Sequence, residues 1–118
     1  MPRYLMLSTL TNAGRESLHS HPERLVEVDQ EIEKMGVKVI AQYALLGQYD
    51  FVSIVEAPDN ETIAHLSVDL GSRGTVQIMT LPAISLESFQ AALKSPHQLG
   101  RGENPAPDQG RGRSRAKG

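Results

Sequence analysis

The chain contains no cysteine and no tryptophan, and its 118 residues include only two phenylalanines and three tyrosines. Without cysteine there is no disulfide framework, no thiolate metal site and no cysteine nucleophile. With so few aromatic rings, enclosure of a haem or flavin has little support, and no cofactor is expected. No apolar run approaches the roughly 20 residues of a membrane helix, and no apolar signal core follows Met1. A cytoplasmic protein is therefore expected.

Charge is unevenly spread along the chain. Residues 1–96 hold seven Lys or Arg against twelve Asp or Glu, whereas residues 97–118 hold five against two. An acidic body is a poor surface for nucleic acid, whose binding depends on neutralising phosphates. The segment 96–118 has five glycines, three prolines and one large aliphatic residue, so it is expected to be a disordered tail after a domain of residues 1–95. Its alternating cations predict a solvated terminus, with a weak RNA, membrane or acidic-partner contact as the alternative.

Hydrophobic spacing predicts a strand over 3–10, then a polar stretch with a short turn of helix after residue 11. Ser20 stands three residues before Glu23, which is the spacing of a capping box and predicts a helix start there. An apolar stripe follows at spacings of three and four, made of Leu25, Val28, Ile32 and Met35. Gly36 is expected to end this helix.

The second half of the body repeats the strand and helix signals. Strand runs at 37–46 and 50–57 are separated by residues 47–49 and predict a hairpin. Asp59 is expected to cap a helix, residues 75–81 to form a strand bounded by Pro82, and Ser85 to cap a last helix. The order β-α-β-β-α-β predicts an α+β, ferredoxin-like fold, with one antiparallel sheet and both main helices on one face.

The predicted strands are apolar on both faces. A sheet with one wet face should alternate apolar and polar residues. Here large side chains point both ways: Leu5 and Leu7 oppose Tyr4 and Met6 on one strand, and Val52 and Ile54 oppose Phe51 and Val55 on another. Monomers rarely expose so large an apolar patch. A homodimer, or a higher homo-oligomer, closed through the sheet face is therefore expected.

The hairpin carries a family resemblance. The stretch from Leu46 to Val52 reads LGQYDFV, and Glu56-Ala-Pro-Asp59 follows it. This pattern resembles the GYD family, which is named for such a Gly-x-Tyr-Asp stretch, and the resemblance extends over most of residues 3–94. It implies a ferredoxin-like subunit of the dimeric α+β-barrel group. Related barrels include cofactor-free monooxygenases, haem-degrading enzymes, isomerases and ligand-sensing modules, so the fold does not select a function.

Three residues are candidates for catalysis. Tyr49 and Asp50 are expected at the mouth of a pocket as hydroxyl donor and carboxylate base, and His65 is the histidine suited to acid–base work. Structural roles are the alternative. Gly47 can supply a positive φ to the turn, Asp50 can accept from turn N–H groups, Tyr49 can pack beside the sheet, and His65 can lie on a helix surface.

Ligand-binding candidates are small or polar residues around the predicted hairpin and central strands, namely Gly47, Tyr43, Ser8 and Ser53. They can orient a ligand between sheet and helices or between two sheets, or they can be satisfied by neighbouring backbone. His19 and His21 have a spacing compatible with one metal ion, but no third ligand is evident nearby, so no metal site is expected.

The residues leave three functions open. The first is a small dimeric module, without catalysis, that binds a small molecule or a partner protein. The second is a cofactor-independent enzyme of the dimeric-barrel kind, a monooxygenase or an isomerase, in which Tyr49, Asp50 and His65 move protons. The third is an accessory subunit of a larger complex, tethered by the basic tail. None of the three involves a membrane.

Overall fold

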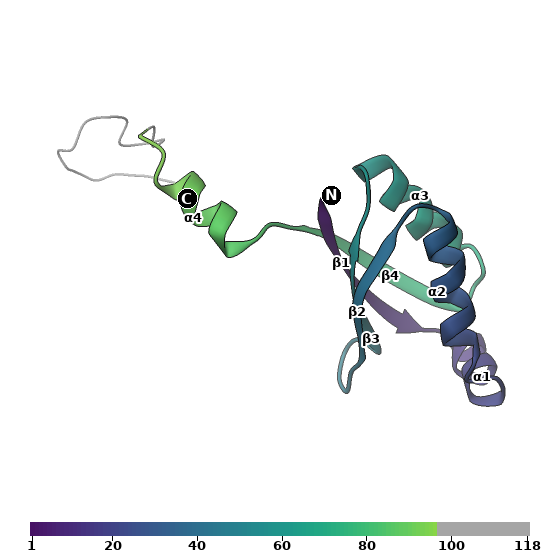
Figure 1. Ribbon diagram of the computed structural model, residues 1–118. Coiled ribbons are helices and arrows are strands. Elements are labelled where there is room, and N and C mark those ends of the chain that lie inside the picture. The colour runs from purple at the N-terminus through teal and green to yellow at the C-terminus, as the bar shows by residue number, and fades with distance from the viewer. Residues whose placement is uncertain (97–118) are drawn as a thin grey trace. The chain divides into compact units, whose positions relative to one another are not determined.

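The computed structural model describes residues 1–96 (Figure 1), so the tail predicted over 96–118 lies almost wholly outside the described residues. One compact unit spans Met1–Ile84, and a second begins at Ser85. The first unit contains β1 (Arg3–Leu10), α1 (Asn12–Ser20), α2 (Arg24–Lys34), β2 (Lys38–Ala44), β3 (Phe51–Glu56), α3 (Asn60–Gly71) and β4 (Val76–Ala83). The described part of the second unit contains α4 (Leu86–Leu93).

The four strands form one sheet in the order β2-β3-β1-β4, and every neighbouring pair is antiparallel. Helices α2 and α3 lie on the same face of this sheet (Figure 1). The predicted α+β, ferredoxin-like fold is thereby confirmed. The outer strands carry two irregularities: β2 has a bulge between Val39 and Ala41, and β4 continues through Pro82, where the sequence predicted its end.

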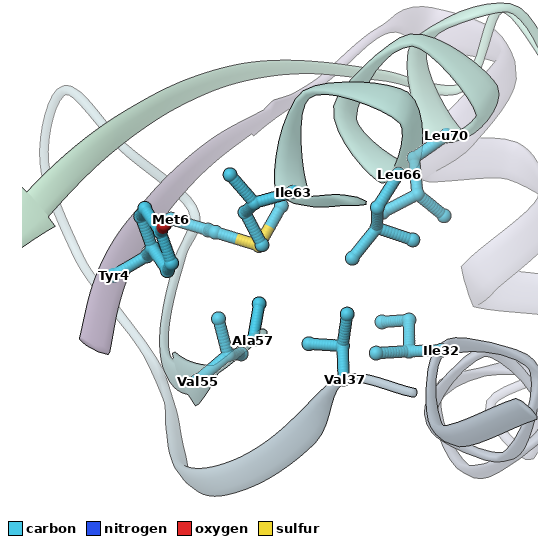
Figure 2. Packing of buried hydrophobic residues seen from close by; sticks show 9 residues of the cluster. All are labelled: Tyr4, Met6, Ile32, Val37, Val55, Ala57, Ile63, Leu66 and Leu70. Carbon is cyan, nitrogen blue, oxygen red and sulfur yellow. The ribbon is translucent and has the colours of Figure 1, made fainter. Parts of the chain in front are cut away.

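The core lies between the sheet and the helices α2 and α3. Figure 2 shows Ile63, Leu66 and Leu70 of α3 pointing toward side chains from the strands and from the segment before β2. The nine buried hydrophobic residues are Tyr4, Met6, Ile32, Val37, Val55, Ala57, Ile63, Leu66 and Leu70. The alternation of β1 decides which residues enter this core, because Tyr4 and Met6 face the helices while Leu5 and Leu7 face away.

Of the three predicted N-terminal caps, those of α3 and α4 are present and that of α2 is not. The polar stretch after Thr11 is a complete helix, α1, of nine residues. The capping box at Ser20 is wrong: Ser20 ends α1 and its Oγ donates back to the Glu16 carbonyl, and α2 starts without a side-chain cap. A serine hydroxyl can accept from an N–H group that follows it in the chain or donate to a carbonyl that precedes it, and here it donates to the preceding Glu16 carbonyl. Asp59 and Ser85 do cap α3 and α4, as predicted.

Gly14 fixes α1 against the loop before β4. The Thr11 N–H donates to the Thr75 carbonyl at 3.0 Å, and the Thr11 hydroxyl donates to the Gly74 carbonyl at 2.7 Å. These bonds bring the backbone so close that a Cβ on Gly14 would overlap the Thr75 carbonyl oxygen and lie 3.2 Å from Cδ2 of Leu10. Only glycine fits this contact.

The face of the sheet turned away from α2 and α3 is apolar in two adjacent cross-strand rows. One row is Leu81, Leu5, Ile54 and Ala41, and the next is Met79, Leu7, Val52 and Tyr43. These eight residues are called the apolar sheet face below. A row containing Arg3, Glu56 and Lys38 borders it on one side, with an Arg3–Glu56 ion pair of 3.1 Å. The face thus has an apolar centre and a charged border.

Helix α4 is amphipathic. Its start is capped by the Ser85 hydroxyl, which accepts from the Ser88 N–H at 3.0 Å, and its apolar stripe of Leu86, Phe89 and Leu93 is exposed. Across the described residues, no helix has the length and apolar character needed to cross a membrane.

Candidate functional site

A cavity of about 480 Å³ lies between the helices α1 and α2 and the sheet. Its walls are mainly aliphatic, and they come from Met6, Leu18, Leu25, Val28, Ile32 and Val55, with further residues from β4 and α3. The volume falls in the range of about 300–1,000 Å³ typical of small-molecule sites. The whole cavity belongs to the unit Met1–Ile84.

Three polar side chains form a connected group in this apolar wall. Nε2 of Gln42, on β2, donates to Oδ1 of Asp29 on α2 at 2.9 Å and to Oγ of Ser53 on β3 at 3.2 Å. Alternation along the strands places Gln42 and Ser53 side by side, because they are register partners on the helix-facing side of the sheet. One amide group thus links helix α2 to the strand pair β2–β3.

Asp29 carries the charge of this group. Burial raises the pKa of its carboxyl above the ordinary value, the negative charge of Glu33 acts in the same direction, and the hydrogen bond from Gln42 opposes both. Within residues 1–96, Oδ2 of Asp29 has no hydrogen-bond or ion-pair partner. A partly desolvated carboxylate oxygen therefore remains available to a donor in the cavity.

Two arginines also line the cavity, and both are paired with glutamates of α2. Arg24 donates to Glu27 at 3.2 Å, and Arg73 donates to Glu31 at 2.7 Å. The Arg73 hydrogen bond lowers the pKa of Glu31, so this pair stays ionised at neutral pH. Since their charges are already matched, these guanidinium groups contribute little free positive charge to the cavity.

The structure brings three of the four predicted ligand-binding residues to the cavity lining, namely Ser8, Ser53 and Tyr43. The phenol ring of Tyr43 belongs to the apolar sheet face, since Tyr43 alternates with Gln42 along β2. Gly47 does not line the cavity; its φ of 131° supports the turn between β2 and β3.

The three predicted catalytic residues lie elsewhere. Among the described residues, Tyr49, Asp50 and His65 are all absent from the cavity lining. The Tyr49 hydroxyl donates to Sδ of Met79 at 3.7 Å, at the apolar sheet face. His65 is exposed on α3, 3.2 Å from the carboxylate of Asp69.

Asp50 joins the hairpin to the central strand. Its Oδ2 accepts from the Leu10 N–H at 2.7 Å, and its own N–H donates to the Ser8 carbonyl at 2.8 Å. The carboxylate thus bonds to the end of β1, whereas the sequence suggested N–H groups of its own turn. This contact supplies a structural reason for the Gly-x-Tyr-Asp pattern.

Replacing Asp50 separates the structural from the catalytic role. We expect Asp50→Ala to lower the free energy of unfolding by about 1–3 kcal/mol, because the Leu10 N–H loses its acceptor in a partly buried place. Asp50→Asn keeps a carbonyl oxygen there and should remain within about 1 kcal/mol of the wild type. Urea denaturation of both variants checks this, and equal losses for the two would contradict it.

No group of three or more His, Cys, Asp or Glu residues that could hold a metal ion occurs in the part of the chain described here. His21, one of the two histidines with metal-compatible spacing, lies 3.0 Å from the Glu27 carboxylate and 3.3 Å from that of Glu23. It is held at the start of α2 by these acidic residues.

Sequence reasoning missed Asp29 and Gln42. Both had a detectable signal, because Asp29 directly follows Val28 of the apolar stripe and Gln42 interrupts an otherwise apolar strand centre. What the sequence did not show is that the two face each other across the gap between α2 and β2. That pairing depends on the bulge at Val39 and Ala41, which shifts the register of β2 by one residue.

Comparisons of the sequence with known proteins identify its family. The GYD domain profile matches residues 4–93, which includes all four strands apart from Arg3 at the start of β1. The chain belongs to the GYD family. A relative from Thermus thermophilus, the "glutamine synthetase and cystathionine beta-lyase binding protein", is 53% identical over 95 residues, which are 80% of this chain and 100% of the relative. A solved structure, FFRP-DM1, aligns with a TM-score of 0.49 at 21% identity, covering 71% of this chain and 100% of that one.

Proposed function

We propose that this GYD protein is a cytoplasmic homodimer that binds a partner enzyme and has no catalytic activity of its own. The partner is expected to be a glutamine synthetase or a cystathionine beta-lyase. The observation that carries the proposal is the relative whose whole length aligns at 53% identity and whose name states that it binds these two enzymes. An accessory role in a larger complex is included in this proposal.

The apolar sheet face supports the homodimer. It contains no charged side chain, so two copies can meet there without bringing like charges together, and a charged row borders it. Apolar centres with polar rims are typical of protein interfaces. A two-fold interface requires a patch that is complementary to itself, which an uncharged apolar face satisfies.

The catalytic alternative has weaker support from the geometry. A proton-transfer site needs an acid or base within reach of a bound substrate. Tyr49, Asp50 and His65 lie outside the cavity lining, and Asp50 is engaged with the backbone of β1. The described cavity lining contains one carboxylate, Asp29, and no histidine, so it holds no acid–base pair.

Binding to the two enzymes tests the proposal. We expect the immobilised full-length chain to bind purified glutamine synthetase, cystathionine beta-lyase, or both, from the same organism with a Kd in the micromolar range or tighter, which corresponds to about −8 kcal/mol. The measurement is biolayer interferometry, with an unrelated oligomeric enzyme as control. Absence of binding to both enzymes at tens of micromolar would overturn the proposed partner.

A full-length variant separates binding by the domain from tethering by the tail. In this variant four of the five basic residues of segment 97–118, namely Arg111, Arg113, Arg115 and Lys117, are replaced by serine. If the folded domain binds the partner, the Kd at physiological salt should be unchanged in this variant. If the tail acts as a tether, the variant should bind as weakly as the wild type does at high ionic strength, where salt screens the same charges.

A further inference from the structure

The free hydrogen-bonding atoms of Asp29 and Gln42 in the cavity are both acceptors. Both N–H groups of the Gln42 amide are used, one by Asp29 and one by Ser53. Oδ2 of Asp29 and Oε1 of Gln42 remain without a partner among the described residues, and the nearby Ser8 hydroxyl can either donate or accept. A ligand that satisfies this group must therefore bring donors.

The charge of the site favours a positive ligand. Asp29 is the one charged residue of the lining without an ion-pair partner within residues 1–96, since Arg24 and Arg73 are neutralised by Glu27 and Glu31. Residues 1–96 also carry more acidic than basic side chains. A neutral donor would leave the carboxylate charge uncompensated beside aliphatic walls, which is unfavourable.

The remaining lining specifies the rest of the ligand. The apolar side chains of Met6, Leu18, Leu25 and Phe51 line the same cavity as the polar group of Asp29, Gln42 and Ser53. The part of the ligand that contacts them is therefore expected to be apolar. We propose that this cavity binds a small organic amine, whose ammonium group is held by Asp29 and Gln42 and whose apolar body lies among these side chains. The proposal does not depend on the partner-binding function.

Three ligands with the same hydrocarbon chain and different polar ends test whether the cavity prefers an ammonium group. Hexylamine, hexanol and hexanoate share the same chain and differ in charge, and each is titrated into the full-length protein by calorimetry. We expect hexylamine to bind roughly tenfold more tightly than hexanol, because a charge-assisted hydrogen bond is about twice as strong as a neutral one. Hexanoate should bind more weakly than hexanol. Equal affinities for amine and alcohol, or binding of none of the three at millimolar concentration, would overturn the proposal.

Two matched variants locate the binding. Asp29→Asn keeps an oxygen that accepts from Gln42 and removes the charge, so hexylamine should fall to the affinity of hexanol while hexanol is unchanged. Asp69→Asn makes the same change on the exposed surface of α3 and should leave the preference intact. A preference for the amine that survives Asp29→Asn would contradict the assignment.

A folding control accompanies these titrations. Since burial disfavours the ionised Asp29 carboxyl and raises its pKa, the unliganded Asp29→Asn protein should melt at or above the wild-type temperature at neutral pH. Loss of amine binding then reflects the missing charge in a folded protein. Because no partner enzyme is present, this experiment can fail while the proposed partner binding holds, and the reverse is equally true.

Discussion

Replacing Ile54 by lysine is expected to abolish the proposed homodimer and leave a monomer. Ile54 lies in the apolar sheet face, with Leu5 as its register partner on β1 and Ala41 on β2. In a two-fold interface the substitution occurs twice, so two unpaired ammonium groups would be buried. Each uncompensated buried charge costs about 3–5 kcal/mol. The dimer dissociation constant should therefore rise by at least roughly a hundredfold.

Light scattering coupled to gel filtration measures this change. At micromolar concentration the wild type should show twice the 12.9 kDa mass of the chain, and the variant should show the single mass. Val68→Lys is the matched control, because Val68 is 69% exposed on α3 and lies on the helical side of the molecule. A monomeric wild type would remove the homodimer from the proposed function. A variant that stays dimeric would place the interface on another surface.

The second large effect is expected from Gly14→Ala. In a helix this substitution usually stabilises by up to about 1 kcal/mol. Here the new methyl group would overlap the Thr75 carbonyl oxygen, and its two nearest neighbours are backbone atoms that cannot rotate away. Forcing an extra carbon into a filled site costs about 1–3 kcal/mol, and more where the backbone must shift. We expect a net loss of about 2 kcal/mol or more in the free energy of unfolding.

Gly71→Ala provides the comparison for this prediction. Gly71 ends α3 without a positive φ, and a Cβ there meets no atom within 4 Å. The same chemical change should be neutral or stabilise by up to about 1 kcal/mol. Urea denaturation of both variants at one protein concentration separates the two cases, since the stability of a dimer depends on concentration. Losses of similar size in the two variants would show that the contact with Thr75 is not the cause.

The predictable parts of this protein are those encoded by local pattern. The order of strands and helices along the chain, the two capping residues Asp59 and Ser85, and the placement of Tyr4 and Met6 on the face opposite Leu5 and Leu7 all follow from spacing and residue type. The positive φ of Gly47 was likewise visible in the sequence. Each of these features depends on residues within a few positions of one another.

The parts that escaped prediction depend on contacts between distant segments. The residues around Gly14 suggest only a turn. The requirement for glycine comes from the contact with Thr75, which lies sixty-one positions later in the chain. The sequence around Asp50 predicts hydrogen bonds within its own turn. Its carboxylate instead accepts from the Leu10 N–H at the end of β1. The site group of Asp29, Gln42 and Ser53 likewise comes from three elements. Sequence spacing gives no direct measure of such approaches.

The irregular outer strands have a consequence for how copies of the chain associate. A sheet in the order β2-β3-β1-β4 has two free borders, and unpaired backbone groups on a border can recruit a strand from another molecule and continue into fibres. The bulge at Val39 and Ala41 distorts one border, and Pro82 lacks an N–H on the other. Growth by strand addition is thereby discouraged on both sides. The proposed homodimer would use the face of the sheet, where a two-fold contact closes after two copies, so this route of assembly would be limited in size.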